Sequence, residues 1–575
     1  MKKRILYGSA DYEEIVRNNG YFIDKTQYIR KIEIIENAVF LRPRRFGKSL
    51  WCRILECYYN INKKDDFEKL FGYTYIGKNP TPLRNSFFVL HLDFSVISLG
   101  KTITDIEDSF NIICNSRMKT MIGLAKAWFQ DKIELPDHSR ASDNLKRILD
   151  FIEQNHFPTL YVIIDEYDNF ANQLIVSHKD NLYRQLTSDD SFFKTFFKTL
   201  KEGRKTGSIA NVFITGVLPI TIDDLASGFN IARFITLNPK FENMLGFTHS
   251  EVDTLIDEIY KDYDINPSTR SLVNDLIKTH YNGYHFVNSN GEAVYNSTIL
   301  MYFLVEFSEL KSIPKQLTDL NLKTDISWVK RLTGSNPHLT EEFVDQLTIH
   351  NTIRYDDRLL VEKFDMSQFF EESYFPISFF YLGMLTRKDD FYLKLPNLNM
   401  RQIFVEYFNE IHHIDVSTKY AEMMQGFVNS LDLPKIFADY WELYISQLPE
   451  AIFQKVNENF YRTTFFELCS RYLSRWFTWN VERSYPQGKT DLEFVGKFHE
   501  IFAGIRIVIE FKYFSNADFK KFKTKITDFQ LHAEDLKQLK GYVEGLKQEY
   551  PEAKISQYVI YCFGNQGFKI FDVNH

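Results

Sequence analysis

Residues 42–49 read RPRRFGKS, and they lie between an apolar run at Asn37–Pro43 and a helical pattern that continues as SLWCRILECYY. The final GKS fits the phosphate-binding pattern GxxxxGK[ST], while Arg42 stands where that pattern has its first glycine. A strand, a turn and a helix in this order bring backbone amides to an anion at the helix N-terminus. The segment therefore predicts a P-loop, although a GKS tripeptide also occurs by chance at turns.

The loop residues have predicted roles in binding ATP. Gly47 lets the backbone close around an anion, Lys48 reaches the β- and γ-phosphates, and the Ser49 hydroxyl ligates Mg²⁺. The arginines inside the loop are placed to balance phosphate charge or to contact a partner. The predicted ATP-binding residues of the loop are Arg45, Phe46, Gly47, Lys48 and Ser49.

A second motif follows at residues 160–169, LYVIIDEYDN, where an apolar strand ends in two adjacent acids. Asp165 is predicted to hold Mg²⁺, and Glu166 to orient the water that attacks the γ-phosphate. Thr215, which ends the run NVFIT, is a candidate γ-phosphate sensor, and Asp93 ends VLHLD in the same way, although both also suit ordinary strand ends. Two motifs at strand ends predict an ATP site more strongly than either alone.

A third pattern lies near the C-terminus. Residues 488–494 read GKTDLEF and residues 507–513 read IVIEFKY, an apolar strand interrupted by an acid and a lysine. Glu510 and Lys512 share one face of that strand because side chains alternate, and Asp491 supplies a second carboxylate for a hard cation. The pattern predicts a metal site in which Asp491 and Glu510 hold Mg²⁺ or Mn²⁺. The competing interpretation is a Glu–Lys ion pair on a strand edge.

Length and composition are those of a globular multidomain protein. The 575 residues suggest about three or four domains. Hydrophobic residues make up 44% and the net charge is −7, so a wholly basic nucleic-acid coat protein is improbable. Five cysteines without a CxxC pair indicate neither a disulfide framework nor a zinc finger. With no secretory pattern and no run of about 18 apolar residues, we expect a cytoplasmic protein without a membrane segment.

Strands separated by helical stretches over the first 235 residues predict a parallel sheet covered on both faces. Residues 240–450 are mostly helical, and strand patterns return after about 450. The predicted strands are Asn37–Pro43, Ser86–Phe94, Leu160–Asp165, Asn211–Val217, Arg233–Leu237, Asp491–Val495, Ile505–Tyr513 and Gln557–Phe563.

Taken together, these motifs resemble the AAA-ATPase-like family of bacterial proteins, whose members carry a C-terminal domain of the PD-(D/E)XK nuclease superfamily. In that family the first glycine of the loop is commonly replaced, so Arg42 departs only from the general pattern. The resemblance rests on YFIDKT (21–26), FLRPRRFGKSL (40–50), LHLDFS (90–95), IIDEYDN (163–169), MLGFTHSEV (244–252), YNGYHF (281–286) and YLGMLT (381–386).

The resemblance implies three parts: a P-loop domain at 1–235, a helical lid and connector at 236–450, and a restriction-endonuclease-like α/β domain at 451–575. It places YNGYHF in a lid over the nucleotide and gives Lys512 a role in positioning or deprotonating the attacking water. Gln538, with Tyr542 one helical turn later, resembles the QxxxY element of exonuclease-like members, so Gln538 joins the predicted catalytic set. Glu458 resembles an extra acid from the first helix of the nuclease fold.

The two leading interpretations of function differ in chemistry. One is an ATP-regulated, metal-dependent nuclease that acts on DNA or RNA; the other is a signalling or scaffold ATPase whose C-terminal domain binds nucleic acid or a protein partner without cutting. Intact acids and lysine favour the first. Four closely spaced lysines follow the IVIEFKY pattern and could contact phosphates or belong to a solvated charged loop; they are lysines 520, 521, 523 and 525. Substrate, pathway and self-association stay open at this stage.

Overall fold

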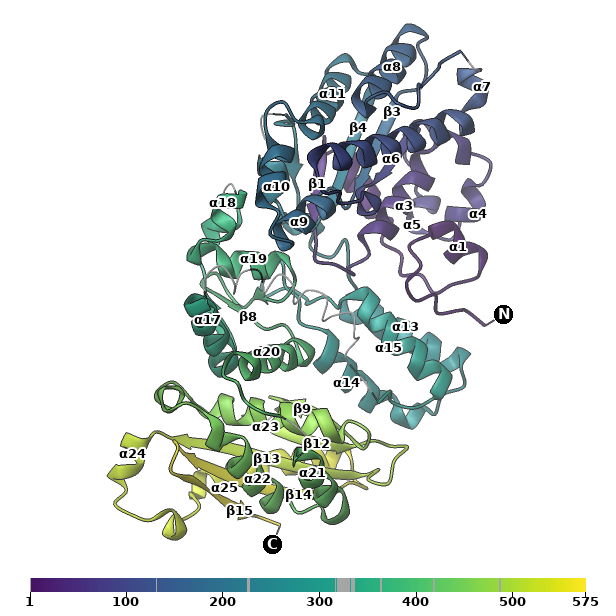
Figure 1. The fold of residues 1–575 in the computed structure, drawn as a ribbon. Helices are drawn as coiled ribbons and strands as arrows, with labels where there is room; N and C mark the ends of the chain where they lie inside the picture. The colour runs from purple at the N-terminus through teal and green to yellow at the C-terminus, as the bar shows by residue number, and fades with distance from the viewer. Residues whose placement is uncertain are drawn as a thin grey trace.

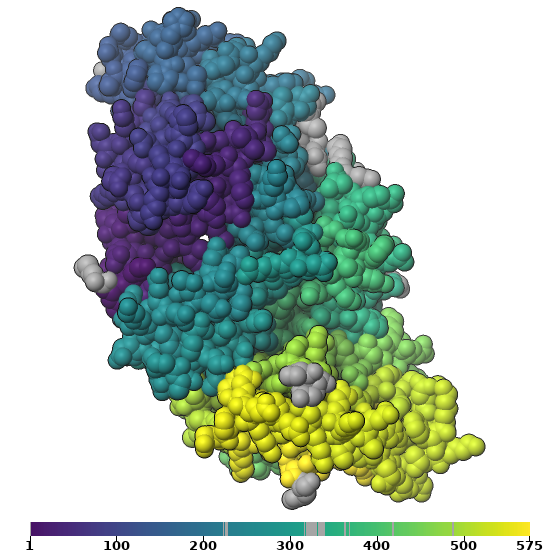
Figure 2. All heavy atoms as spheres, turned by 180° about the vertical axis from the view of Figure 1, so that it is seen from behind, coloured from purple at the N-terminus to yellow at the C-terminus, as the bar shows by residue number. Residues whose placement is uncertain are grey.

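A computed structural model describes residues 2–130, 132–224, 228–315, 317, 331, 337–361, 364–416, 419–485 and 488–574. An N-terminal unit and a C-terminal unit lie at opposite ends of the molecule, with the middle region between them (Figure 1). The same order is visible from behind, where the teal and green middle region separates the purple and blue unit from the yellow one (Figure 2). The middle region is therefore the part of the chain through which the two ends are connected.

The N-terminal unit is built on a five-stranded sheet in the order β2-β3-β4-β1-β5. Every neighbouring pair is parallel, so the predicted parallel sheet is confirmed. Strand β4 lies between β1 and β3, which places its carboxyl end between the two predicted ATP motifs. The strands are β1 (Ala38–Leu41), β2 (Phe88–Asp93), β3 (Leu160–Asp165), β4 (Ile209–Gly216) and β5 (Arg233–Phe234).

Helices cover both faces of this sheet. Tyr59 at the end of α3 stacks on Tyr161 of β3 with ring centroids 4.4 Å apart, and Phe129 of α7 packs on Phe88 of β2, whose side chain points to the opposite face. The helices are α1 (Tyr12–Arg17), α2 (Tyr28–Glu33), α3 (Lys48–Tyr59), α4 (Phe67–Phe71), α5 (Tyr75–Lys78), α6 (Ile103–Leu124), α7 (Lys126–Phe129), α8 (Ala141–Gln154), α9 (Asn169–Val176), α10 (Asp180–Thr187), α11 (Phe192–Thr206) and α12 (Ile220–Asp224).

The middle region is mainly helical, as predicted, but it also contains a small antiparallel sheet in the order β6-β8-β7. Its strands have only two or three residues each, too few for a periodic sequence signal. The elements are α13 (His249–Asp262), α14 (Arg270–Tyr281), α15 (Ser297–Leu310), α17 (Pro337–His350), β6 (Thr352–Arg354), α18 (Met366–Phe369), α19 (Phe375–Tyr381), β7 (Thr386–Arg387), β8 (Tyr392–Lys394) and α20 (Leu398–Ile411).

The C-terminal unit has a mixed five-stranded sheet in the order β15-β14-β13-β12-β9, in which only β13 and β14 are parallel. Helices α22 and α23 pack on one face, and α25 covers the other. The elements are α21 (Lys419–Ser430), α22 (Leu433–Leu443), α23 (Glu458–Leu473), β9 (Phe477–Val481), β10 (Ser484–Tyr485), β11 (Gly488–Lys489), β12 (Leu492–Gly496), β13 (Ile505–Phe514), α24 (Asn516–Lys521), α25 (Ala533–Glu549), β14 (Lys554–Phe563) and β15 (Gly567–Asp572).

Aromatic packing crosses the predicted boundary at residue 450. Phe427 of α21 lies 6.1 Å from Phe477 of β9, and Phe437 of α22 lies 6.0 Å from Phe511 of β13, measured between ring centroids. The two helices before residue 450 therefore share a core with the C-terminal sheet. Within the described residues, none of the helices combines the length and the apolar character needed to span a bilayer.

Candidate active sites

The P-loop wraps the start of α3, where Gly47 has a left-handed φ of 90°. Lys48 is buried, and its Nζ donates to the carbonyl oxygens of Arg42 at 3.1 Å and Pro43 at 3.2 Å. The same Nζ lies 3.3 Å from Oε1 of Glu166, so the predicted phosphate-binding lysine and the predicted catalytic glutamate form an ion pair. Lys48 must exchange these partners for phosphate oxygens when an anion enters the loop.

Arg42 points away from the phosphate side of the loop. Its guanidinium donates to the carbonyl oxygens of Thr236 at 2.9 Å and Glu242 at 3.2 Å, and lies 4.3 Å from the ring centroid of Phe286. Burial lowers the pKa of Arg42 to about 9. The residue that replaces the first motif glycine thus anchors the loop to the segment after β5.

The second motif ends β3 beside the loop. Oδ1 of Asp165 and Oγ1 of Thr215 are buried and have no hydrogen-bond partner among the described residues. Burial, together with the neighbouring Glu166 charge, raises the pKa of Asp165 to about 6. Glu166 has a φ of 50°, which is uncommon for a residue with a side chain and often marks a functional position. The unpaired oxygens of Asp165 and Thr215, at the strand ends next to the P-loop, fit a site for a cation and a phosphate.

Asp168, the last acid of the DEYD run, has a structural role that sequence reasoning did not assign. It is fully buried and accepts from the backbone N–H groups of Val217 and Leu218, and from Asn172. The carboxylate thereby fixes the turn that follows β4. Asp93, at the end of β2, caps the turn that follows that strand by accepting from the Ser95 N–H at 2.8 Å.

A cavity of about 410 Å³ opens beside the loop, lined by Ser49, Asp93 and Asp165 among others. His91 on its wall is held through Nδ1 by Glu56 at 2.7 Å. Ligand atoms of Cys52, His91 and Asp165 lie within 4.8 Å of one another, one of two such groups among the described residues. The cavity gives the Asp165 side of the loop room for ligand and water.

The middle region covers the other side of the loop. The Phe46 ring packs edge-on against Tyr284 and Phe286, with ring centroids 5.1 and 5.3 Å away. A Cβ on Gly383 would come within 2.5 Å of the Pro43 side chain, so the YLGMLT segment is in direct contact with the loop. Ser297 at the start of α15 donates to the carbonyl of Arg45 at 3.2 Å.

The YNGYHF segment makes hydrogen bonds at Asn282 and His285 within the middle region. The N–H of His285 donates to Oγ1 of Thr386 at 2.6 Å, and Asn282 accepts from the N–H of Gly283 at 2.8 Å. The aromatic residues of this motif therefore make its contact with the loop. His412 and His413, which are adjacent in the chain, lie elsewhere in the middle region. His412 pairs with Asp345 at 2.6 Å, and His413 is exposed.

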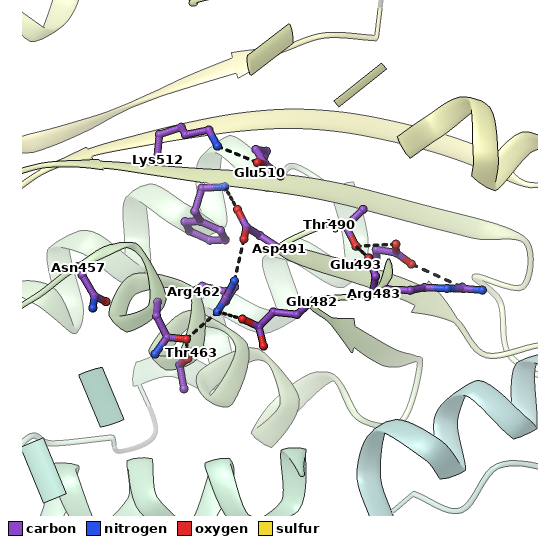
Figure 3. A network of polar contacts seen from close by, with 12 residues as sticks. Asn457, Arg462, Thr463, Glu482, Arg483, Thr490, Asp491, Glu493, Glu510 and Lys512 are labelled. Atoms are coloured by element: carbon purple, nitrogen blue, oxygen red, sulfur yellow. Dashed lines mark hydrogen bonds and ion pairs between the residues drawn. The ribbon is translucent and has the colours of Figure 1, made fainter. Parts of the chain in front are cut away.

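In the C-terminal unit, Asp491, Glu510 and Lys512 lie together (Figure 3). Leu492 pairs with Ile509 in the antiparallel β12–β13 register, so Asp491, one residue earlier, faces Glu510 across the strands. Lys512 Nζ donates to Oε1 of Glu510 at 2.8 Å. Oε2 of Glu510 is buried without a hydrogen-bond partner among the described residues, which fits a cation at this position.

Two further acids surround this group. Glu458 begins α23, and its pKa is raised to about 7 by burial and by the Asp491 charge. Asp535 of α25, which sequence reasoning missed, lies 3.8 Å from Lys512 Nζ. Gln538 donates to the hydroxyl of Tyr542, and no described hydrogen bond joins Gln538 to the acids. The structure thus gathers Glu458, Asp491, Glu510 and Lys512, and Gln538 lies on α25 one turn from Asp535 and from Tyr542, with its described hydrogen bond to Tyr542.

Burial and neighbouring charges shift the pKa values of Glu510 and Lys512. Burial and the Asp491 carboxylate raise the pKa of Glu510 to about 8. Burial alone would lower the pKa of Lys512, but the Glu510 carboxylate outweighs it and raises that pKa. Within this coupled pair, Lys512 therefore holds its proton more tightly than Glu510 does.

Comparison with protein-family models agrees with this geometry. The model of a predicted AAA-ATPase, the AAA-ATPase-like family, matches residues 6–226, and that of the PD-(D/E)XK nuclease superfamily matches residues 456–572. The chain carries both domains. A search of curated proteins found no match.

Within the nuclease domain, Arg462 was not predicted. It sits one turn after Glu458 on α23, and Nη1 donates to Oδ1 of Asp491 at 2.7 Å (Figure 3). The spacing i, i+4 from a predicted acid was the available signal. Glu493, two residues after Asp491, is fully buried and accepts from Tyr485 at 2.6 Å and Thr490 at 2.9 Å, so it belongs to the core network. The four lysines that follow β13 (520, 521, 523 and 525) are all exposed.

Proposed function

We propose that this chain is an ATP-binding, ATP-hydrolysing protein whose C-terminal domain cleaves DNA or RNA with a divalent metal. The observation that carries the proposal is the β12–β13 register, which sets Asp491 opposite Glu510 and leaves one buried oxygen of Glu510 unpaired. Arg462 pairs with Asp491 and Lys512 with Oε1 of Glu510, but Oε2 of Glu510 has no partner among the described residues. A buried oxygen of this kind is costly unless a cation takes it. The PD-(D/E)XK family match supports the same reaction class.

In the nuclease domain, Asp491 and Glu510 would hold Mg²⁺ or Mn²⁺, with Glu458 available as a further acid. Such a metal supplies a Lewis acid and an acidified water. The Phe511 N–H orients Asp491 by donating to its Oδ2 at 2.8 Å. Lys512, protonated beside Glu510, positions the attacking water or stabilises charge that develops on the phosphate.

In the ATPase-like domain, Lys48 would bind the β- and γ-phosphates, and Ser49 and Asp165 would hold Mg²⁺. Thr215 lies between the motifs with its hydroxyl unpaired, which suits a γ-phosphate contact. Glu166 orients the attacking water once Lys48 has left it for phosphate. Arg45 and Phe46 shape the loop, whose closure depends on Gly47.

Nucleic acid is the proposed partner despite the net charge of −7. The exposed lysines that follow β13 offer a local cationic segment soon after Lys512 in the chain, and phosphate contacts need only local charge.

Cleavage of single- and double-stranded DNA and RNA with Mg²⁺ or Mn²⁺, with and without ATP, tests the nuclease proposal. Glu510→Gln should abolish cleavage while leaving the fold intact, because glutamine keeps the shape and removes the carboxylate that would ligate the metal. Glu552→Gln, an exposed site in the same domain, is the matched control. A wild type that binds nucleic acid but cuts none under any condition would favour the binding-only alternative.

A further inference from the structure

Two hydrogen bonds orient Asp491 in the nuclease site. Arg462 donates to Oδ1 at 2.7 Å, and the Phe511 N–H donates to Oδ2 at 2.8 Å. Each carboxylate oxygen carries two lone pairs, so both can still ligate a metal while the plane of the group is fixed. Outer hydrogen bonds of this kind commonly tune metal-binding carboxylates. Arg462 therefore has the contacts of a positioning residue.

The ion pairs continue beyond Arg462. Its Nη2 donates to Oε1 of Glu482 at 3.0 Å (Figure 3), and Oε2 of Glu482 accepts from Nη2 of Arg401 at 2.9 Å. Although burial opposes it, the two arginines lower the pKa of Glu482 to about 2, so Glu482 stays charged. Arg401 comes from α20, which lies outside residues 6–226 and 456–572.

The same helix reaches the P-loop. Met400, Ile403 and Tyr407 of α20 line, together with P-loop residues 43–46, a cavity of only about 20 Å³. That volume has room for about one water molecule, so little free space remains in the cavity that the helix and the loop line together. The residue before α20, Asn397, donates to the carbonyl of Asn282 at 3.1 Å, which ties the helix to the YNGYHF segment on the loop.

We propose that Arg462 positions Asp491 for metal binding, and that α20, through Arg401 and Glu482, makes this positioning depend on the nucleotide state of the P-loop. The inference rests on the proposed metal-dependent nuclease function and adds its control by ATP.

Phosphate binding changes the face of the loop that α20 meets. Lys48 must leave the carbonyls of Arg42 and Pro43, and Pro43 is one of the loop residues that line the small cavity together with the helix. Packed elements move as units because interiors are dense. A shift of α20 therefore moves Arg401, and Arg401 shares the carboxylate that holds Arg462.

Mn²⁺ binding to the full chain tests the proposal by calorimetry, with and without a saturating non-hydrolysable ATP analogue. The heat of Mn²⁺ binding to Glu510→Gln measures Mn²⁺ bound at other sites, and it is subtracted from that of the other proteins. Arg462→Ala should weaken Mn²⁺ binding about 10–100-fold. In the wild type the analogue should change Mn²⁺ affinity about fivefold or more, and Mn²⁺ should change analogue affinity by the same factor. Arg401→Ala should remove both changes.

Gln402→Ala is the matched control, because Gln402 joins the same two helices by donating to Ser470 at 2.5 Å but lies outside the ion-pair chain. It should keep the coupling, and Arg401→Lys, which keeps a charge beside Glu482, should restore most of it. Unfolding midpoints of the Arg401 and Gln402 variants, measured alongside, separate this effect from loss of structure.

The outcomes separate the two proposals. If the wild type binds Mn²⁺ and cuts nucleic acid, and Glu510→Gln does neither, the nuclease function stands. An Arg462→Ala variant with unchanged Mn²⁺ affinity, or an Arg401→Ala variant that keeps the wild-type coupling, would then overturn this inference alone. A wild type without Mn²⁺ binding at Glu510 would overturn both.

Discussion

In the ATPase-like domain, Lys48 is paired with Glu166 at 3.3 Å, and in the nuclease domain Lys512 is paired with Glu510 at 2.8 Å. The two lysines nevertheless differ in what they must do next. Lys48 would have to leave its acid, because the proposed ligand of its site is an anion. Lys512 can stay, because the proposed ligand is a cation that shares the acid with it. If both proposals hold, ligand binding breaks the ion pair in the first site and leaves it in place in the second.

The acids differ as well. Asp165 has a free buried oxygen, whereas both oxygens of Asp491 accept hydrogen bonds. Asp491 is therefore oriented by two hydrogen bonds in the absence of a metal, and the unpaired oxygen of its site is on Glu510. Substitutions at matched positions should therefore have opposite consequences for binding and for turnover.

The largest expected effect is on ATP turnover. Glu166→Gln should reduce it by about 10²–10⁴-fold, the usual contribution of a group that positions or activates water. ATP affinity should not fall, because the change also releases Lys48 from its ion pair. Steady-state turnover and equilibrium ATP binding measure the two quantities. Turnover at the wild-type rate would remove Glu166 from the mechanism.

The second effect contrasts the two lysines directly. Lys48→Ala should weaken ATP binding about 10–100-fold, since a charged hydrogen bond is worth about 1.5–3 kcal/mol. Lys512→Ala should not weaken Mn²⁺ binding, because it removes a positive charge beside the acids, yet it should abolish cleavage. Calorimetry with each ligand checks both statements. Equal ATP affinity of Lys48→Ala and wild type would contradict the P-loop assignment.

A smaller effect concerns Arg42, where the chain departs from the phosphate-binding pattern. Arg42→Gly restores the motif glycine but leaves the carbonyls of Thr236 and Glu242 without their donor and a void beside Phe286. We expect a loss of about 2–4 kcal/mol in the free energy of unfolding. Arg44→Gly, at a half-exposed position in the same loop, is the control for denaturant titration. Greater stability of Arg42→Gly would show that the buried guanidinium is dispensable.

The sequence predicted the strands that are buried on both faces most closely. Leu160–Asp165 matches β3 in full, because an apolar run of this length has few alternatives in a parallel sheet. The edge strand β15 was missed, since its residues are only half-buried and its pattern GFKIFD mixes polar and apolar positions. The short strands of the middle region had no periodicity to detect.

Prediction of the candidate sites was similarly uneven. Glu510 and Lys512 could be placed on one face from alternation alone, and Asp165 from its position after a buried strand. The roles of Arg42, Arg462 and Arg401 could not be predicted, because their partners lie 20 to about 200 residues away in the chain. An isolated arginine has no sequence pattern that names its partner.

The last prediction separates the two sites by pH. Burial and nearby carboxylates raise the pKa of Asp165 to about 6, of Glu458 to about 7 and of Glu510 to about 8. Metal must displace these protons, so metal binding strengthens as pH rises and levels off above each value. Mg²⁺-dependent ATP turnover should therefore reach its plateau one to two pH units below Mn²⁺-dependent cleavage, when both are followed from pH 5.5 to 9.

The metal-free protein should show the same groups in its stability. Each acid keeps its proton in the folded state at pH values where the unfolded chain has lost it, so the free energy of unfolding falls as pH rises between about 4.5 and 8. Glu510→Gln cannot ionise, and its curve should fall less steeply from pH 6 to 8, with Glu552→Gln following the wild type. Coincident pH midpoints for ATP turnover and cleavage, or parallel stability curves for Glu510→Gln and wild type, would mean that the two sites do not differ in how tightly they hold their protons.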